Sequence, residues 1–345
     1  MNRSRIAGLG HYVPERILTN SELEQTVETS DQWIRDRTGI HERHIAAPHE
    51  TSSSLALEAA RAALADAGIA ADSLDLVIVG TTTPDGLFPS VASAVQHGLG
   101  ASHAGAFDIN AACMGFLSAF ASGSQFIATG AARRVLVIGT EVLSRMVDWS
   151  DRGTCVIFGD GAGALVLDAA DYGGPMGFVL RSDGSKREAL FADGPCGRRD
   201  YAPDAAPDYL IKMDGPAIFK FAVHAMTGAV REATARSGIS VEDIDLLVPH
   251  QANLRIIQGT AKALGLPPEK AFVNVERYGN TSSASIPIAL SEASAQGRLH
   301  EGDRVVLCGF GGGLAWGSLA LEWSRTGVAP TRAPRALAAD TVLSS

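Results

Sequence analysis

The stretch AGIAADSLDLVIVG, from Ala67 to Gly80, decides the fold because it returns later in the chain as SGISVEDIDLLVPH, from Ser237 to His250. The two stretches align without a gap. Each residue of the first stretch is therefore separated from its match in the second by the same number of residues that separates Ala67 from Ser237. Each copy follows an Ala-rich amphipathic pattern and leads into an apolar run typical of a buried strand. The sequence therefore predicts two structurally equivalent halves.

Further repeats extend this duplication toward the C-terminus. The run RRVLVIG from Arg133 matches DRVVLCG from Asp303 at the same spacing, and GALVL from Gly163 matches GSLAL from Gly317 at a slightly smaller one. Short strand patterns alternate with helical ones, which is typical of α/β proteins with helices on both faces of a mixed sheet. We expect pseudo-symmetric halves over residues 1–173 and 174–324, and a tail outside the fold over residues 325–345, which are rich in Ala, Pro and small polar groups.

Composition excludes several classes of protein. The chain has 345 residues, of which 46% are apolar and 19% charged, as expected for a soluble globular protein with a core large enough for two halves. Its formal charge of −9 argues against nucleic acid as a partner. No apolar run reaches the roughly 18–20 residues that cross a membrane, and the N-terminus lacks a signal-peptide pattern. We therefore expect a cytoplasmic protein without membrane association.

The four cysteines have no spacing typical of a metal site, so no metal is expected. Cys155 and Cys308 stand in apolar, strand-like runs and are expected to be buried core thiols, while Cys196 stands in a loop and is expected to have no role. Cys113 differs from them. It stands in DINAACMGF, which begins at Asp108, where a strand pattern delivers it to the first turn of an apolar helix.

A thiol at a helix N-terminus is stabilised as thiolate by the helix dipole and by unpaired N–H groups, so Cys113 is predicted to have a lowered pKa and to act as a nucleophile. By its local pattern alone, Cys113 can equally be a small residue that packs at a crowded helix start. The nucleophile hypothesis therefore requires partners from elsewhere in the chain.

The second half supplies two such partners. His250, in PHQAN, ends a strand pattern just before a helical one, and Asn280, in YGNTSSA, also precedes a helix. A histidine near a helix N-terminus is expected to be neutral and to donate a hydrogen bond to a developing oxyanion, and the asparagine amide can donate a second. Equivalent strand ends in α/β folds converge on ligand sites, so we expect both residues to meet Cys113 at the seam between the halves.

Six motifs in this order resemble the β-ketoacyl-acyl carrier protein synthase III family, condensing enzymes of the thiolase superfamily, over about Ile6 to Glu322. The motifs are TSDQWIRDRTGIHERHIA at Thr29, DINAACMGF at Asp108, DRGTCVIFGDGAGALVL at Asp151, VPHQANLRII at Val248, YGNTSSASIP at Tyr278 and GFGGGLAWGS at Gly309. The resemblance implies a duplicated five-layer α-β-α-β-α fold, a homodimer, and an enzyme without a cofactor whose substrates are acyl-CoA and malonyl-acyl carrier protein (malonyl-ACP).

The resemblance also implies a mechanism with Cys113, His250 and Asn280 as its catalytic residues. Cys113 takes an acyl group from a short acyl-CoA, and the backbone N–H groups of Cys113 and Gly312 form the oxyanion hole. His250 and Asn280 then stabilise the enolate that forms when malonyl-ACP loses carbon dioxide. The products are 3-oxoacyl-ACP, CoA and CO2, and the reaction initiates type II fatty acid synthesis.

Binding residues follow from the same resemblance. Trp33 and Arg152 are expected to hold the two faces of the CoA adenine, Arg37 a CoA phosphate, and Asn253 the pantetheine arm. Lys220, Arg255 and Lys262 are expected to form a basic patch that binds the acidic carrier protein. Leu143 and Phe310 are expected to line the acyl pocket, and Phe88 to reach across the dimer and close the acyl pocket of the partner. Taken singly, Trp33 is more typical of a core or interface position than of a stacking platform, and the basic residues are typical of solvated helix surfaces.

Three residues depart from the family pattern: Met114 after the nucleophile, Pro216 near the CoA tunnel and Ala263 in the basic patch. They leave open which primer is used and how tightly the carrier binds, and Met114 marks where substrate preference is expected to differ. Two alternatives also stay open. One is an acyltransferase or specialised condensing enzyme of secondary metabolism that uses the same Cys113, and the other is a non-catalytic binding partner, against which the intact Cys113, His250 and Asn280 set argues.

Overall fold

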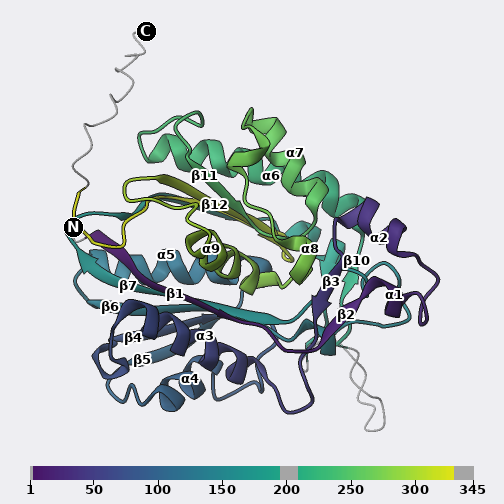
Figure 1. Ribbon diagram of the computed structural model, residues 1–345, viewed down its shortest axis with the longest axis horizontal. Coiled ribbons are helices and arrows are strands. Elements are labelled where there is room, and N and C mark those ends of the chain that lie inside the picture. The colour runs from purple at the N-terminus through teal and green to yellow at the C-terminus, as the bar shows by residue number, and fades with distance from the viewer. Residues whose placement is uncertain (1–2, 195–208, 330–345) are drawn as a thin grey trace.

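The computed structural model describes residues 3–194 and 209–329. Figure 1 shows five layers, in which a central layer of helices lies between two sheets and each sheet carries further helices on its outer face. The central helices contact strands of both sheets, so they form the shared core. The helices of the three layers are α3 (Ser52–Ala67) and α4 (Val91–Leu99) on one outer face, α5 (Gly115–Ala128) and α9 (Ser285–Ala295) in the centre, and α6 (Gly215–Arg236) and α7 (Leu254–Leu264) on the other outer face.

Both sheets are mixed, as the sequence predicts. The first has the order β1-β7-β6-β4-β5 and the second the order β8-β13-β12-β11. Strands β6, β4 and β5 run parallel in the first sheet, as do β12 and β11 in the second, and the other pairings are antiparallel. The strands are β1 (Arg3–Tyr12), β4 (Leu76–Gly80), β5 (Gly105–Ile109), β6 (Arg134–Glu141), β7 (Gly161–Ala170), β8 (Gly174–Ser182), β11 (Leu246–Pro249), β12 (Arg304–Gly311) and β13 (Ala315–Glu322).

Four strands of the first sheet are repeated in the second, and β5 has no counterpart among the described strands of the second sheet. Strands β4 and β11, strands β6 and β12, and helices α5 and α9 each begin at the same spacing, which is the one found in the sequence between Ala67 and Ser237. Strand β8 stands in the second sheet where β1 stands in the first, beside β13 and β7 respectively. The duplicated α-β-α-β-α architecture implied by the sequence is therefore present.

The Ala-rich composition of α3 is explained by how closely it packs on the first sheet. A side chain on Gly8 of β1 would place its Cβ 2.1 Å from the Ala63 carbonyl oxygen, and one on Gly10 would lie 2.4 Å from the Ala63 nitrogen. Glycine in the strand and alanine in the helix therefore let the two backbones approach without a gap. The fully buried Leu55 and Val77 belong to the same cluster.

Smaller elements cover the ends of the sheets. Strand β2 (Ile17–Thr19) pairs with β3 (Glu42–His44), and β9 (Leu190–Phe191) pairs with β10 (Lys212–Met213). Short helices α1 (Asn20–Leu23), α2 (Asp31–Thr38) and α8 (Val275–Tyr278) complete the set. Buried Arg43 connects β2 to the turn that contains Val156, because its guanidinium donates to the carbonyls of Leu18 and Val156.

Some of the sequence predictions need correction. Cys155 and Cys308 are buried as expected, but Cys155 lies in a turn rather than a strand, and Cys196 lies outside the described residues. The predicted tail begins at Arg325, yet Arg325 pairs with Asp66 at 2.8 Å and its N–H donates to Glu301. These bonds hold the start of that segment against the fold, and residues 330–345 lie outside the described part. No helix within the described residues has the length and apolarity to span a membrane.

Candidate active site

Two matching turns, one in each half, form the base of the site. Residues 112–114 and 282–284 are 3-10 turns that lead into α5 and α9, and their first residues, Ala112 and Ser282, have φ of 48° and 49°. In each turn the asparagine two positions earlier, Asn110 or Asn280, accepts a hydrogen bond from that N–H. A positive φ is strained for residues other than glycine, and such strain is typical of functional sites. The first turn presents Cys113, just before α5 begins at Gly115.

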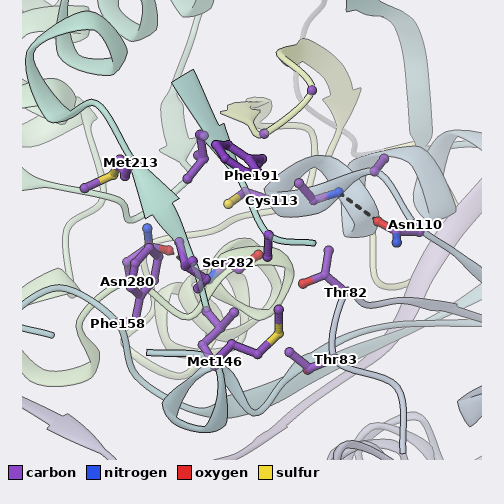
Figure 2. A pocket seen from close by; sticks show the side chains of 18 of the residues that line it. Thr82, Thr83, Asn110, Cys113, Met146, Phe158, Phe191, Met213, Asn280 and Ser282 are labelled. Atoms are coloured by element: carbon purple, nitrogen blue, oxygen red, sulfur yellow. Dashed lines mark hydrogen bonds between the residues drawn. The ribbon is translucent and has the colours of Figure 1, made fainter. Parts of the chain in front are cut away.

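A cavity of about 1380 Å³ opens between the halves and is lined by Cys113, His250 and Asn280. The structure thus brings the three predicted catalytic residues to one place from both halves of the sequence. Figure 2 shows Cys113, Ser282 and Asn280 around this cavity, with Thr82 and Met146 nearby. Among residues 3–194 and 209–329, no group of three His, Cys, Asp or Glu side chains is placed to hold a metal ion.

Cys113 has a raised pKa in this structure, contrary to the sequence prediction. Burial raises the pKa of the thiol from 9.0 to about 12; a hydrogen bond from Ser282 lowers it, Glu141 raises it, and the residue's own N–H lowers it. The N–H of Cys113 and the Ser282 hydrogen bond therefore lower the pKa, but desolvation of a side chain only 8% exposed outweighs them. The resting residue is a thiol, and its proton must leave during acyl transfer.

The raised pKa predicts how Cys113 reacts with iodoacetamide. Only the thiolate is alkylated, so the rate should rise about tenfold per pH unit from about pH 7 to about pH 9, without a plateau. Intact-protein mass spectrometry at short reaction times measures this rate, and a Cys113→Ala sample shows the reaction of the remaining cysteines. A plateau near neutral pH would instead show a stabilised thiolate.

His250 directly follows β11 and is 1% exposed. Burial lowers the pKa of its imidazole from 6.5 to about 3, so the ring is neutral at physiological pH, as predicted. The physical cause is desolvation rather than the helix dipole on which the prediction relied. Nδ1 lies 2.6 Å from the Ser285 hydroxyl, whereas Nε2 is buried without a hydrogen-bond partner among the described residues. A neutral ring with one unpartnered nitrogen at a cavity is suited to bind a substrate oxygen.

Asn280 is oriented by its own turn. Its Oδ1 accepts a hydrogen bond of 2.8 Å from the Ser282 N–H, and its backbone bridges to the strand-like segment at Phe158. With Oδ1 engaged, Nδ2 is the group left to donate into the cavity. Asn280 therefore presents a donor to the cavity that His250 also lines, where a developing oxyanion requires two donors.

The glycine backbone at the end of β12 lies close to Cys113. Gly311 and Gly312 follow one another at the end of β12, and a side chain on Gly311 would place its Cβ 2.7 Å from the Cys113 nitrogen. Gly312 lines the cavity, as the predicted oxyanion hole requires. Glycine is thus needed at position 311 because the two backbones nearly touch.

Glu141, at the end of β6, is a buried carboxylate that links the two halves. It accepts hydrogen bonds from the Thr82 N–H and hydroxyl and the Thr83 hydroxyl in the first half, and from the Ser282 and Ser283 hydroxyls in the second. Burial raises the pKa of the Glu141 carboxyl, and these donors oppose the increase. The hydrogen bonds fix the turn at Ser282 that orients Asn280.

Replacing Glu141 with glutamine should destabilise the protein. The amide NH2 would face hydroxyl and N–H groups that now donate to the carboxylate, at a cost of about 1–3 kcal/mol. Urea unfolding followed by circular dichroism measures the loss. The control is Glu58→Gln, because Glu58 lies on the surface, where it pairs with exposed Arg61. Equal unfolding midpoints for Glu141→Gln and the unchanged protein would contradict this role.

The acyl-pocket predictions are only partly met within one chain. Leu143 and Phe310 line the cavity, and the Phe310 ring lies edge-on to His250 at 5.7 Å. Phe88 does not line it and is 86% exposed. Met114 packs against Gly309 and Gly317 in the core, is 1% exposed and is not among the residues that line the cavity.

Three of the four predicted CoA residues, Trp33, Arg37 and Arg152, form a cluster outside the cavity lining. The guanidinium carbons of Arg37 and Arg152 each lie 4.9 Å from the centre of the Trp33 ring, and Arg152 also donates to the Glu28 carbonyl. Admitting an adenine between Trp33 and Arg152 needs two stacking distances of about 3.5 Å, so Arg152 must move. Asn253 connects this cluster to the cavity, because it lines the cavity and donates to the Arg37 carbonyl.

Three predicted carrier-binding residues, Lys220, Arg255 and Lys262, are exposed on α6 and α7, which pack together. Arg255 lies over the exposed Phe219 ring at 5.3 Å. Within the described part of the chain none of the three basic residues forms an ion pair. Pro216, in the first turn of α6, does not line the cavity, although its neighbour Gly215 does.

Sequence reasoning did not identify Ser282, Glu141 or Ser285 as parts of the site. A signal for the two serines was present, because DINAACMGF from Asp108 and YGNTSSASI from Tyr278 lie at the same spacing as the other repeats. Aligning them would have matched Asn110 with Asn280 and the Cys113 turn with the Ser282 turn. Glu141 has no such signal, because its role depends on contacts between distant segments.

Comparisons with known proteins agree with this geometry. Family models match residues 107–184, as 3-oxoacyl-[acyl-carrier-protein] synthase III, and residues 234–323, as the C-terminal part of the same family. The chain is 52% identical to β-ketoacyl-[acyl-carrier-protein] synthase III of Symbiobacterium thermophilum, covering 93% of this chain and 98% of that protein. It is 49% identical to the Rhodobacter capsulatus protein of that name, over 93% of this chain and 99% of the relative.

Solved structures give the same result. The 3-oxoacyl-[acyl-carrier-protein] synthase III of Aquifex aeolicus superposes with a TM-score of 0.87 at 45% identity, over 93% of this chain and 100% of that one. The priming β-ketosynthase of the R1128 polyketide pathway superposes with a TM-score of 0.88 at 37% identity, over 93% and 96%. The chain belongs to the β-ketoacyl-[acyl-carrier-protein] synthase III family of condensing enzymes.

Proposed function

We propose that this enzyme condenses a short acyl-CoA with malonyl-ACP through an acyl-Cys113 intermediate and so initiates type II fatty acid synthesis. The observation that carries the proposal is the convergence of Cys113, His250 and Asn280 on one cavity between the two halves. A nucleophile next to two hydrogen-bond donors is what acyl transfer followed by enolate formation requires.

The first step is acyl transfer. The Cys113 sulfur attacks the thioester carbonyl, and the N–H groups of Cys113 and Gly312 stabilise the oxyanion. The carbon–sulfur bond to CoA then breaks. Since one thiol replaces another, the proton that Cys113 loses ends on the CoA sulfur, and the step needs no net proton acceptor.

The second step forms the carbon–carbon bond. Malonyl-ACP loses its carboxylate as CO2, and the electron pair of the broken bond moves onto the thioester oxygen as an enolate. Hydrogen bonds from His250 and Asn280 stabilise that charge. The enolate carbon attacks the acyl-Cys113 carbonyl, and the Cys113 sulfur leaves as a thiolate, giving 3-oxoacyl-ACP. The thiolate then takes up one proton from solvent, which restores the resting thiol.

Substrate binding extends this proposal to the surface. Trp33 and Arg152 would hold the adenine of CoA after Arg152 moves, Arg37 a phosphate, and Asn253 the pantetheine arm. The exposed cations Lys220, Arg255 and Lys262 would attract the acidic carrier protein, which explains how a chain of net charge −9 binds an anionic partner.

A homodimer accounts for the exposed loop after β4. Leu87 and Phe88 are 69% and 86% exposed, which is unusual for large apolar side chains on a free surface. In a dimer, Phe88 would close the acyl pocket of the partner. Phe88 would then take part in primer choice together with Leu143 and Phe310.

A competition among acyl-CoA substrates tests the proposed reaction. The enzyme is given acetyl-, isobutyryl-, octanoyl- and aromatic CoA thioesters with malonyl-ACP, and CO2 and 3-oxoacyl-ACP are measured. Short acyl groups should give both products in equal amounts. A preference for a long or aromatic primer would favour a specialised condensing enzyme, which the similarity to the R1128 priming ketosynthase also supports. Acyl transfer to an acceptor without CO2 release would show a plain acyltransferase.

A further inference from the structure

The pair of His250 and Ser285 stands out when the two halves are compared. Their counterparts in the first half, at the spacing of the duplication, are Gly80 and Gly115. These glycines touch, since a Cβ on Gly80 would lie 2.3 Å from the Gly115 carbonyl carbon. The second half keeps the same register of strand and helix but places a histidine and a hydrogen-bonded serine there. Both glycines of the first half are thus replaced in the second, one by His250 and the other by Ser285. This paired difference is consistent with one shared role for the two residues.

The hydrogen bonds of Ser285 define the direction of its hydroxyl. Ser285 is 2% exposed and begins α9. Among the residues that the structure describes, its Oγ has two hydrogen-bond neighbours, the Gln251 N–H at 3.3 Å and His250 Nδ1 at 2.6 Å. The Gln251 N–H can only donate, so Oγ accepts from it. The single hydroxyl hydrogen is then satisfied only if it points at Nδ1, because the alternative leaves it buried without an acceptor.

We propose that Ser285 is a positioning residue, whose hydroxyl donates to His250 Nδ1 and so keeps the ring proton on Nε2. Nε2 is the ring nitrogen that is buried at the site without a partner among the described residues. With Nδ1 occupied as an acceptor, the neutral imidazole carries its only N–H on Nε2. That N–H is a fixed donor for the oxygen of the malonyl thioester. The proposal rests on the proposed function for its effect on turnover, but not for the tautomer itself.

The neighbouring amide group of Gln251 holds the arrangement in place. Its Nε2 donates to the carbonyls of Pro249 and Phe272, and its Oε1 accepts from the Asn274 N–H. Both ends of the side chain are therefore bonded, and the backbone N–H that meets Ser285 cannot shift easily. This rigidity is what a fixed tautomer needs in order to donate without reorganisation.

The test combines nitrogen NMR with two separate rate measurements. The full-length enzyme is labelled with ¹⁵N-histidine, and the His250 signals are assigned by their loss in His250→Asn. In the unchanged enzyme, Nε2 should appear protonated and Nδ1 unprotonated. In Ser285→Ala the ring proton should move to Nδ1 or exchange between the nitrogens. Condensation should fall by about 10- to 100-fold, the usual loss when the hydrogen-bond partner that orients a metal-ligating histidine is removed, while acylation of Cys113 by acyl-CoA should persist.

Two further variants separate positioning from general damage. Ser285→Thr keeps a hydroxyl and should restore the Nε2 proton, whereas Ser283→Ala removes a buried hydroxyl that bonds to Glu141 and should leave the His250 tautomer unchanged. A proton on Nδ1 in the unchanged enzyme would overturn the proposal even if Ser285→Ala does not fold. Retention of both the Nε2 proton and full condensation in Ser285→Ala would also overturn it. The NMR result does not depend on substrate, so failure of the proposed function remains a separate outcome.

Discussion

Replacing Cys113 with alanine is expected to abolish 3-oxoacyl-ACP formation from acyl-CoA and malonyl-ACP. The acyl group then has no covalent carrier, and no other described cysteine lines the cavity. Incubation with acetyl-CoA followed by intact-protein mass spectrometry should show one acetyl adduct on the unchanged enzyme and none on Cys113→Ala. The change removes a single buried sulfur, so the fold should persist.

The control is Cys155→Ala. Cys155 is fully buried in the core and does not line the cavity, so this variant should keep the acetyl adduct on Cys113 and condensation. Appreciable 3-oxoacyl-ACP from Cys113→Ala, with acyl-CoA as the primer, would contradict a nucleophilic role for this residue.

Replacing Asn280 with alanine is expected to lower condensation by about 10²–10³-fold, the usual cost of losing one preorganised oxyanion donor. Acylation of Cys113 should remain nearly normal, because Asn280 is assigned to the enolate of the second substrate. Single-turnover assays measure the two steps separately. The contrast with Cys113→Ala, which loses both steps, is the main expected result.

Thr281→Ala serves as the control for Asn280→Ala. Thr281 is the next residue and is also buried, its hydroxyl has no hydrogen-bond partner in the described part of the chain, and it does not line the cavity. Its loss should therefore affect both steps little. If Asn280→Ala instead reduced acylation and condensation equally, Asn280 would act on the first step or on the shape of the site rather than on the enolate.

The sequence predicted the architecture well because duplication leaves a visible trace. The matched runs before β4 and β11 set the register between the halves, and the same spacing recurs in the starts of α5 and α9. Strand order within each sheet could not be read from periodicity, because it depends on which strands pair across long connections. The family resemblance supplied the five-layer arrangement but no strand order.

The catalytic residues could also be predicted, but their protonation states only in part. Cys113 and His250 both stand near helix starts, where the dipole favours thiolate and neutral imidazole. Burial moves the pKa of Cys113 against the dipole and that of His250 with it. The extent of burial depends on how both halves close over the cavity, which local sequence does not contain. One prediction therefore failed and the other was right for a different reason.

Residues that act through other residues were the hardest to predict. Glu141 lies far in sequence from the serines that it binds, and Ser285 is one of several serines in a single motif. Their importance follows from hydrogen-bond direction and burial, which only a structure provides. Met114 shows the converse, since its place next to Cys113 indicated a role in substrate choice but its side chain packs into the core.

A single-turnover chase tests the acyl-Cys113 intermediate most directly. The enzyme is acylated with isotopically labelled acetyl-CoA, freed of CoA, and then mixed with malonyl-ACP labelled differently in its free carboxyl group. The acetyl label should leave Cys113 at the rate at which it enters 3-oxoacyl-ACP, with an equal amount of labelled CO2 released. An acetyl label that stays on Cys113 while product without that label accumulates would contradict the proposed mechanism.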